Sequence, residues 1–500
     1  MATTNFMVAI ELGSTRIMGV AGQKDLDGSL TILAYASEDA SACIRKGVVF
    51  NIDKTAQAIT SIINKLEATL DASIAKVYVG ISGQSLHTVR NTVGKQLDGE
   101  TRITTNIVNE LIALDRSSLS DEYDILEVLP QEYKVGSGMQ IDPVGVIANH
   151  IEGHFLNIVA RPGVKQKIES CFELACTNIA GYFIAPIEMA KVVLNDAEYR
   201  SGCALVDFGA ETTTVQVYKD HILRHLTVLP LGSSSLTKDI CSLNIEEADA
   251  EELKIKYASA YTEPSEEGGH TMNYTYGSGE STITDQLLNE ICEARMEEII
   301  INVKHQINLS GYADKLLGGI IVTGGASVMN GLQTAFLKKT GFEKFKIATY
   351  VIPSVESVSP EPLEKNARMN TLLGLLHAAQ ENCREPEPIK GNLFDEDGES
   401  ASASADKERL EKEQLLEQQK AEAARIAQEQ EAARAAELAR IAQEKADQEA
   451  AERRAEEERL EAERQAKREE EKRRKKESSL FGRLQKWGKK LADDIVNGDE

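Results

Sequence analysis

Two segments of this sequence place a carboxylate, a glycine and hydroxyl groups directly after an apolar run. In the first, Glu11, Gly13, Ser14 and Thr15 follow the apolar residues 6–10. Backbone N–H groups and hydroxyls in such a turn can bind phosphate oxygens, while the carboxylate orients a hydrated Mg²⁺ ion. Taken alone the pattern is weak, because glycine and hydroxyl residues are common in ordinary hairpin turns.

The same pattern returns later in the chain. Asp207, Gly209, Thr212 and Thr213 follow the apolar residues 203–206, and a second strand-like run comes after them. Two hairpins of this kind predict a duplicated domain that binds a nucleotide between its halves. Glu11 and Asp207 would then lie nearest the metal ion.

A third element is a buried-looking strand that runs into paired glycines. Residues 318–323 are largely apolar and lead into Gly324, Gly325 and Ala326. Glycine has no Cβ, so the backbone there can approach a flat ligand closely. Each of the three elements could be an ordinary strand end, but their order and spacing together predict a nucleotide site.

The last residues, 478–500, carry a different chemistry. Leu480, Phe481, Leu484, Trp487 and Leu491 recur at helical spacing, with Lys and Arg on the flanks. An apolar face with aromatic residues beside cations is typical of a helix lying on an anionic bilayer. The alternative is a helix that packs on the chain's own globular part, as most amphipathic helices do.

Between these parts the composition changes twice. Residues 381–405 are rich in Pro, Gly, Ser and acids and predict a disordered linker. Residues 406–477 consist almost entirely of Ala, Glu, Lys, Arg and Gln and predict a charged helical spacer. Its large apolar residues are too sparse for an unbroken coiled-coil seam, so a solvated single helix is favoured over a weak coiled coil.

The overall composition limits the function classes. The formal net charge of −24 disfavours nucleic-acid binding, which needs a basic surface. Seven cysteines without paired spacing indicate reduced thiols in the cytoplasm rather than a disulfide or zinc framework. The sequence begins without a basic, apolar leader and contains no apolar run of membrane-spanning length.

In combination, the three nucleotide elements resemble the phosphate-1, phosphate-2 and adenosine motifs of the actin, Hsp70 and sugar-kinase superfamily. Within it, the sequence is similar to the FtsA family of bacterial cell-division proteins over about residues 5–380. The family's characteristic segments are matched at 77–83, 86–87, 128–133, 142–145, 228–232, 237–240 and 371–376.

The resemblance implies an α/β fold: a duplicated actin-like (ribonuclease-H-like) body of two lobes in residues 1–380. It also implies an FtsA-type subdomain inserted at about 84–162 and a subdomain at about 228–305 that binds the tail of FtsZ. A long C-terminal helix would follow, and its long charged portion departs from the family's usual short linker.

By the same resemblance, the two hairpins would contact ATP phosphates and Mg²⁺ water. Glu251 and Lys254 match positions expected near the ribose, and Gly324, Gly325 and Ala326 match the adenosine site. For Glu251 and Lys254 an ordinary solvated helix face is the alternative. Arg295 matches the arginine that binds the acidic FtsZ tail, with a helical ion pair to Glu298 as an equally open reading.

Four positions depart from the family pattern: Glu11 replaces Asp, Glu211 replaces a glycine, Thr214 replaces an Asp, and Ala185 replaces a Glu. Alanine can neither accept a proton nor orient a water molecule. A carboxylate at Glu211 is unfavourable beside polyphosphate unless it turns outward. ATP and Mg²⁺ binding are therefore expected, and rapid hydrolysis is not.

The resemblance thus implies a cell-division actin homologue that binds ATP, polymerises and anchors the FtsZ ring. The anchoring would take place at the cytoplasmic face of the inner membrane at the division site, and the protein would help to recruit other division proteins there. The alternatives are an ATP-hydrolysing enzyme of the actin and Hsp70 superfamily, or a pilus-assembly actin-like adaptor.

Overall fold

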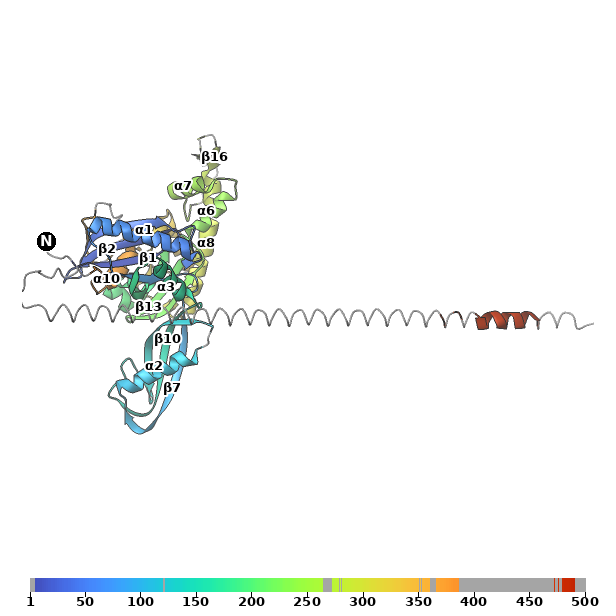
Figure 1. Ribbon diagram of the computed structural model, residues 1–500, viewed down its shortest axis with the longest axis horizontal. Helices are drawn as coiled ribbons and strands as arrows, with labels where there is room; N and C mark the ends of the chain where they lie inside the picture. Colours follow the sequence, from blue (N-terminus) through green and yellow to red (C-terminus); the bar gives the residue numbers. More distant parts are fainter. Residues whose placement is uncertain are drawn as a thin grey trace, which may run out of the picture. The chain divides into compact units, whose positions relative to one another are not determined.

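The computed structural model describes residues 5–119, 122–263, 272–277, 279, 281–349, 351, 353–359, 366–385, 472, 475 and 479–490. The chain divides into two units, Met1–Glu387 and Pro388–Glu500. The first unit contains two lobes and an inserted subdomain (Figure 1).

The first lobe is built on a six-stranded sheet in the order β11-β6-β1-β2-β3-β19. Its strands are β1 (Met7–Leu12), β2 (Arg16–Lys24), β3 (Leu30–Asp39), β6 (Lys76–Ile81), β11 (Asn178–Ile184) and β19 (Val355–Ser357). The hairpin β1–β2 is antiparallel, and β6 runs parallel to β1 on its other side.

Helices cover both faces of this sheet, which explains why its strands are apolar on both sides. Helices α1 (Ile52–Leu70) and α3 (Val164–Leu174) share a core with Val8 and Ile10 of β1. Helix α10 (Asn370–Ala378) packs with Ala9 on the opposite face, next to α4 (Ala185–Val193). The alternation of residues 8, 9 and 10 between the two cores follows from the two-residue period of a strand.

The second lobe repeats this arrangement in a nine-stranded sheet, ordered β18-β17-β12-β13-β14-β7-β10-β8-β9. Strands β12 (Cys203–Phe208), β13 (Thr213–Lys219) and β14 (Ile222–Leu229) are antiparallel neighbours. Strand β17 (Gly319–Thr323) runs parallel to β12, as β6 does to β1, and β18 (Phe345–Ile347) follows it. The predicted duplication of an actin-like unit is confirmed by this repeated topology.

A helical region completes the second lobe. Its elements are α6 (Ser233–Cys241), α7 (Glu247–Tyr257), β15 (Asn273–Tyr276), β16 (Ser281–Thr284), α8 (Asp285–Leu309) and α9 (Leu332–Thr340). Buried residues of α8 pack against Val215 and Val217 of β13 within one core. In Figure 1, α6, α7 and β16 project from the body on the side opposite the inserted subdomain.

The inserted subdomain comprises β7 (His87–Arg102), α2 (Thr105–Ser118), β8 (Asp124–Val135), β9 (Gly138–Gln140) and β10 (Ile147–Ala160). It has its own core, in which Leu111 of α2 packs with Tyr133, Ile151 and Phe155. Its strands join the sheet of the second lobe through one residue pair, Thr227 of β14 with His87 of β7.

The globular body extends further than the sequence suggested. We expected a disordered linker from residue 381, but the Cys383 N–H donates to the Phe6 carbonyl (2.8 Å) and the Glu385 N–H to the Ser73 carbonyl (2.9 Å). These backbone bonds tie residues 383–385 to the first lobe. The rest of the predicted linker, from 386, lies outside the described residues.

Near the C-terminus the structure describes a helix over residues 479–490, together with Lys472 and Lys475. Most of the predicted spacer at 406–477 lies outside the described residues, so its helical character stays a prediction. None of the described helices is both long enough and apolar enough to span a membrane.

Candidate nucleotide-binding cleft

A cavity of about 1060 Å³ lies between the two lobes, where the strand ends of both sheets meet. It is lined from the first lobe by the β1–β2 turn and from the second lobe by the β12–β13 turn, α7 and the segment after β17. Twelve of the thirteen predicted site residues line it: Glu11, Gly13, Ser14, Thr15, Asp207, Gly209, Thr212, Glu251, Lys254, Gly324, Gly325 and Ala326.

The two hairpin turns share the same backbone hydrogen bond. The Gly13 N–H donates to the Arg16 carbonyl (3.1 Å), and the Gly209 N–H donates to the Thr212 carbonyl (2.9 Å). A Cβ on Gly13 would lie 2.7 Å from the Arg16 oxygen, and a Cβ on Gly209 would lie 2.8 Å from the Thr212 oxygen. Both turns therefore require glycine, and both direct hydroxyl side chains into the cavity.

Thr213 is the exception among the predicted site residues. Its side chain is buried away from the cavity, and its hydroxyl donates to the Leu231 carbonyl (2.8 Å). Side chains alternate along a strand, so Thr212 and Thr214 share one side of β13 and Thr213 takes the other. Thr214, which we noted only as a departure from the family pattern, lines the cavity in its place.

The two acids differ in their electrostatic state. Burial, followed by repulsion from Asp207, raises the pKa of Glu11 to about 8. Burial alone raises the pKa of Asp207 to about 6. Glu11 therefore carries a proton near neutral pH in the ligand-free cleft, because ionising it would place two negative charges in a poorly solvated space.

The acids fit a divalent cation. The Oε2 atom of Glu11 is buried without a hydrogen-bond partner among the described residues. Mg²⁺ in nucleotide sites is usually held by one or two carboxylates, phosphate oxygens and water. No described group of three or more His, Cys, Asp or Glu side chains forms a complete protein-only metal site. Glu11 and Asp207 are thus suited to a metal that arrives with phosphates.

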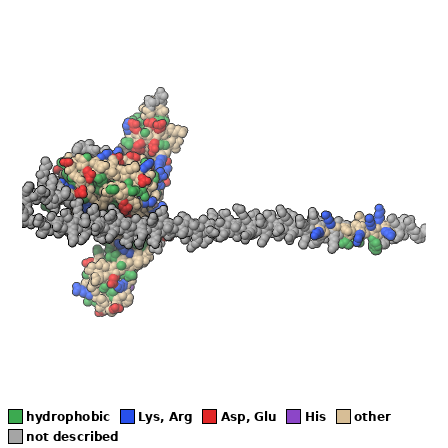
Figure 2. Space-filling view, in the orientation of Figure 1, with side chains coloured by type: hydrophobic (Ala, Val, Ile, Leu, Met, Phe, Trp, Pro, Cys, Tyr) green, Lys and Arg blue, Asp and Glu red, His purple; other side chains and the backbone are tan. Residues whose placement is uncertain are grey.

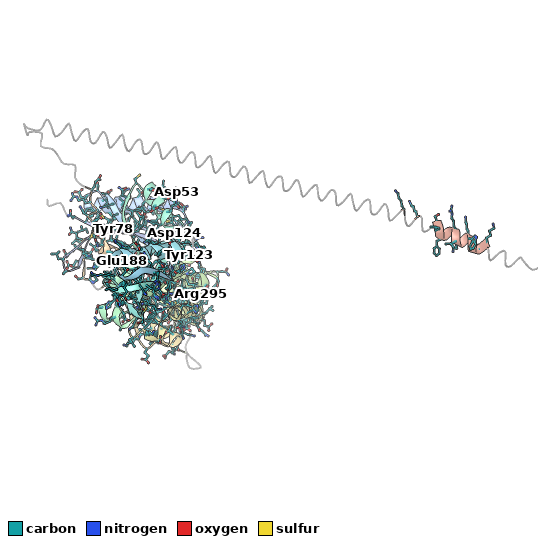
Figure 3. The ribbon with its side chains drawn as sticks, turned by 90° about the horizontal axis from the view of Figure 1, so that it is seen from below. Asp53, Tyr78, Tyr123, Asp124, Glu188 and Arg295 are labelled. Carbon is teal, nitrogen blue, oxygen red and sulfur yellow. The ribbon has the colours of Figure 1, made fainter. Side chains whose placement is uncertain are left out.

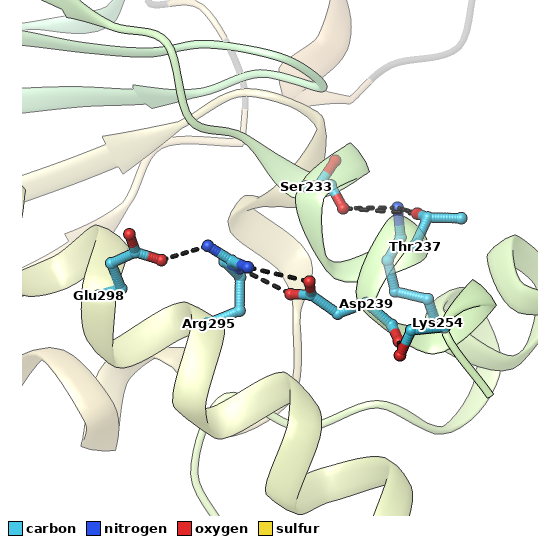
Figure 4. Close-up of polar contacts among 7 residues, drawn as sticks. Ser233, Thr237, Asp239, Lys254, Arg295 and Glu298 are labelled. Atoms are coloured by element: carbon cyan, nitrogen blue, oxygen red, sulfur yellow. Dashed lines mark hydrogen bonds and ion pairs between the residues drawn. The ribbon is translucent and has the colours of Figure 1, made fainter.

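Lys254 is buried, which overturns the solvated helix face as an explanation for this residue. Its ammonium group donates to Glu251 Oε2 (2.7 Å), Thr237 Oγ1 (3.1 Å) and the Ser233 carbonyl (3.3 Å) (Figure 4). These bonds connect α7 to the start of α6. The Glu251 side chain, by contrast, is 44% exposed, and Glu251 lines the cavity.

Gly324 brings the segment after β17 against the second acid. It has a φ of +91°, and a Cβ there would lie 2.3 Å from Asp207 Oδ1 and 2.5 Å from the Phe208 carbonyl oxygen. Gly325 follows beside Arg368, whose side chain lines the cavity. Only glycine fits at 324, because any side chain there would collide with Asp207 and with the Phe208 carbonyl.

Several lining residues were missed from the sequence. Ile255, Val328, Met329 and Arg368 form part of the cavity wall, and the side chains of Ile255 and Val328 are exposed. Ile255 directly follows Lys254 in α7, and Val328 and Met329 come just after the Gly324–Ala326 segment, whereas Arg368 lies in a separate turn, Ala367–Met369, that only the fold brings to the cleft.

Two departures from the family pattern can now be placed. Ala185 begins α4, is buried and lines the cavity beside Pro186. The nearby acid Glu188, labelled in Figure 3, is held by Lys191 at 2.7 Å and is absent from the lining. Glu211 turns away from the cavity as its charge requires, and its Oε2 accepts the Lys46 N–H at 2.6 Å.

Arg295 of α8 is engaged within the chain. Its Nε and Nη2 atoms donate to the two carboxylate oxygens of Asp239 at 2.6 and 2.9 Å, and Nη1 pairs with Glu298 (Figure 4). The hydrogen bonds to Asp239 raise the Arg295 pKa further. The helical ion pair left open from the sequence is present, and a second acid, on α6, joins it.

The C-terminal helix presents its apolar residues to solvent. Leu480, Phe481, Leu484 and Trp487 are all more than half exposed, and Lys and Arg side chains alternate with them along the helix (Figure 2). The predicted contact residue Leu491 lies outside the described residues.

Comparisons with known proteins agree with this architecture. Residues 204–480 match the family described as "Cell division protein FtsA", and residues 83–159 match the "SHS2 domain inserted in FTSA". The latter range corresponds to the inserted subdomain seen here.

Relatives are found in several bacteria. The cell division protein FtsA of Porphyromonas gingivalis is 33% identical over 66% of this chain and 70% of its own length. That of Neisseria meningitidis is 27% identical over 78% and 92%. Among solved structures, the PilM–PilN type IV pilus biogenesis complex matches 74% of this chain and 97% of its own with a TM-score of 0.52 and 14% identity, which supports the fold alone. The chain therefore belongs to the FtsA family of cell-division proteins, actin homologues with an SHS2 insertion.

Proposed function

We propose that this chain binds ATP with Mg²⁺ between its lobes, polymerises in that state and tethers the FtsZ ring to the inner membrane. The observation that carries the nucleotide part is the meeting of two matched turns, each with its acid, in one cavity. Their backbone N–H groups, with the hydroxyls of Ser14 and Thr212, suit phosphate oxygens.

The remaining walls suit the rest of a nucleotide. Glu251 can accept hydrogen bonds from ribose hydroxyls, and Lys254 holds it in place. The exposed apolar side chains of Ile255 and Val328 offer a surface for a flat base. When bound, Mg²⁺ would neutralise part of the phosphate charge, and Glu11 and Asp207 would hold its water ligands.

The chain is poorly equipped for fast hydrolysis. Ala185 provides no carboxylate, and Glu188 is bound to Lys191. Ser and Thr hydroxyls in the cleft are weak bases. An adaptor that binds nucleotide with slow turnover is therefore favoured over an ATP-hydrolysing enzyme of the same superfamily.

The tether would use the C-terminal helix. Its exposed Phe481 and Trp487 would insert among lipid headgroups while the flanking cations contact anionic lipid. Arg295 would contribute to binding the FtsZ tail, and other division proteins would join the filament. A pilus-assembly adaptor is the second candidate, but the exposed basic amphipathic helix favours a membrane tether.

Calorimetric titration of the full chain with ATP, with and without Mg²⁺, tests the nucleotide proposal. We expect Mg²⁺-dependent binding with one site per chain and phosphate release far slower than in typical ATPases. Absence of ATP binding would refute the proposal, and turnover at an ordinary enzymatic rate of about 10 per second would favour the enzyme reading.

A further inference from the structure

A two-residue turn in the first lobe touches both phosphate hairpins. Lys46 and Gly47 connect β4 (Ile44–Arg45) to β5 (Val48–Val49), and their φ angles are +51° and +72°. Positive φ at both central positions is what a type I′ hairpin turn requires. The turn is held from behind, because the Gln84 N–H donates to the Lys46 carbonyl at 3.0 Å.

The two amides of this turn point to acceptors on opposite sides of the cleft. The Gly47 N–H donates to Ser14 Oγ at 2.8 Å, within the first lobe. The Lys46 N–H donates to Glu211 Oε2 at 2.6 Å, and Glu211 lies on the β12–β13 turn of the second lobe. Ile44 of β4 and Val49 of β5 belong to the hydrophobic core of the first lobe. The hydrogen bond from Lys46 to Glu211 therefore joins the two lobes.

The bond to Ser14 has a chemical consequence. A serine hydroxyl has one proton to donate and two lone pairs to accept with. Since Gly47 supplies a proton to the Ser14 oxygen, the Ser14 O–H remains available as a donor, and Ser14 lines the cavity. A phosphate oxygen is an acceptor that such a hydroxyl can bind.

Glu211 is well suited to hold the turn. Its side chain is 20% exposed, and a hydrogen bond from an amide to a carboxylate is stronger than one between neutral groups. The Lys238 ammonium lies 3.9 Å from its other oxygen and adds only a weak attraction. Because the bond points the carboxylate at the turn, its negative charge stays away from the position of the phosphates.

We propose that Glu211 is a positioning residue that fastens the two lobes together over the nucleotide by holding the Lys46–Gly47 turn, and thereby Ser14, in place. This inference rests on the proposed nucleotide function. Glu211, Lys46, Gly47 and Ser14 form one chain of contacts, which we call the Glu211 clasp.

Amide hydrogen exchange of the full chain, read in peptides that contain residues 43–50, tests the clasp directly. Glu211→Ala should speed exchange at Lys46 and Gly47 by roughly 10- to 100-fold, the effect of losing one charge-assisted hydrogen bond. Glu211→Gln, which keeps an acceptor oxygen, should recover much of the protection. Glu343→Ala removes an exposed carboxylate of the same lobe as Glu211. It should change neither the hydrogen exchange of residues 43–50 nor the affinity for Mg²⁺–ATP.

The second measurement is Mg²⁺–ATP affinity by calorimetry on the same variants. Weaker binding by about tenfold in Glu211→Ala, with recovery in Glu211→Gln, would support the proposal. Unchanged exchange at residues 43–50 would overturn the clasp, and faster exchange with unchanged ATP affinity would overturn its role in the nucleotide site. If the wild-type chain bound no ATP, the proposed function would fail, whereas exchange in the nucleotide-free proteins would still decide whether Glu211 holds the turn.

Discussion

Burial, and after it the neighbouring Asp207, raises the pKa of Glu11, although the two acids stand at the ends of strands in different sheets. Ionising both acids would create a charge repulsion across the cleft, and Glu11 therefore keeps its proton near neutral pH when no ligand is bound. A cation that binds both acids would replace the repulsion by attraction and favour the closed cleft.

The first prediction concerns pH. The pKa of Glu11 in the folded state is raised from 4.5 to about 8, so between these two pH values the folded state holds a proton that the unfolded state has lost. The stability of the ligand-free protein therefore falls as the pH rises from about 4.5 to about 8. Mg²⁺ must displace this proton. We therefore expect Mg²⁺–ATP affinity to rise by up to about tenfold per pH unit below about pH 8, measured by calorimetry.

Glu11→Gln is the matched control for this pH effect. The variant should bind Mg²⁺–ATP more weakly and lose the part of the pH dependence that belongs to Glu11. The ligand-free variant should be at least as stable as wild type above about pH 8, because it buries no charge. An identical pH profile in the two proteins would contradict the assignment of the proton to Glu11.

The second prediction concerns Gly324. Gly324→Ala forces a side chain into a left-handed backbone and against Asp207, so it should lower stability by at least about 1–2 kcal/mol and weaken Mg²⁺–ATP binding. Thermal unfolding and calorimetry measure the two effects. Gly341→Ala, at φ +80° and ψ 8° with no heavy atom within 4 Å of the new Cβ, is the control for a positive φ without a steric contact. Equal loss of binding in both variants would refute a local role for Gly324.

The third prediction concerns the acidic partner of Arg295. If a peptide of the FtsZ tail binds Arg295, it must compete with Asp239, which holds the guanidinium by two hydrogen bonds. Asp239→Asn should therefore strengthen peptide binding, and Arg295→Ala should weaken it by roughly 10- to 100-fold, measured by fluorescence anisotropy. Unaltered affinity in Arg295→Ala would leave the arginine with a purely structural role in joining α6 and α8.

The fourth prediction concerns the membrane. Phe481→Glu and Trp487→Glu should each reduce binding of the full chain to anionic vesicles by roughly tenfold or more, because each large apolar side chain contributes about 1.5–3 kcal/mol when buried. Co-sedimentation measures the bound fraction. Gln485→Glu adds the same charge to the same helix without removing an apolar group. If Gln485→Glu reduced vesicle binding as much as Trp487→Glu does, the added charge alone would explain the loss of binding.

Local chemistry made the turns of the cleft predictable. An apolar run followed by an acid and a glycine forces the β1–β2 and β12–β13 turns, and Gly13 and Gly209 show why no other residue fits. Successive side chains of β13 point to opposite sides of the sheet. Because residues 212–214 are all threonine, the sequence does not show which of them point toward the cavity. In the structure Thr214 lies on the cavity side and Thr213 on the other.

Contacts between distant segments could not be predicted. The burial of Lys254 depends on how α6 lies against α7, and the Asp239–Arg295 pair joins residues of two separate helices. The Lys46–Glu211 bond spans 165 positions and both lobes. Sequence patterns identify residues whose side chains could bind a ligand or form an ion pair, whereas the packing of the helices and strands determines which residues they contact.

The inserted subdomain straddles the boundary between the lobes. Its chain leaves the first lobe after β6 and returns before α3, yet its strand β7 is hydrogen-bonded to β14 of the second lobe. Besides the Thr227–His87 pair, the Thr88–Leu226 hydrogen bonds and the Arg224–Glu132 ion pair join the insertion to the second lobe. A change in the angle between the lobes must therefore either break these contacts or move the insertion together with the second lobe. A small rotation at the cleft would then become a larger displacement at the far tip of the insertion.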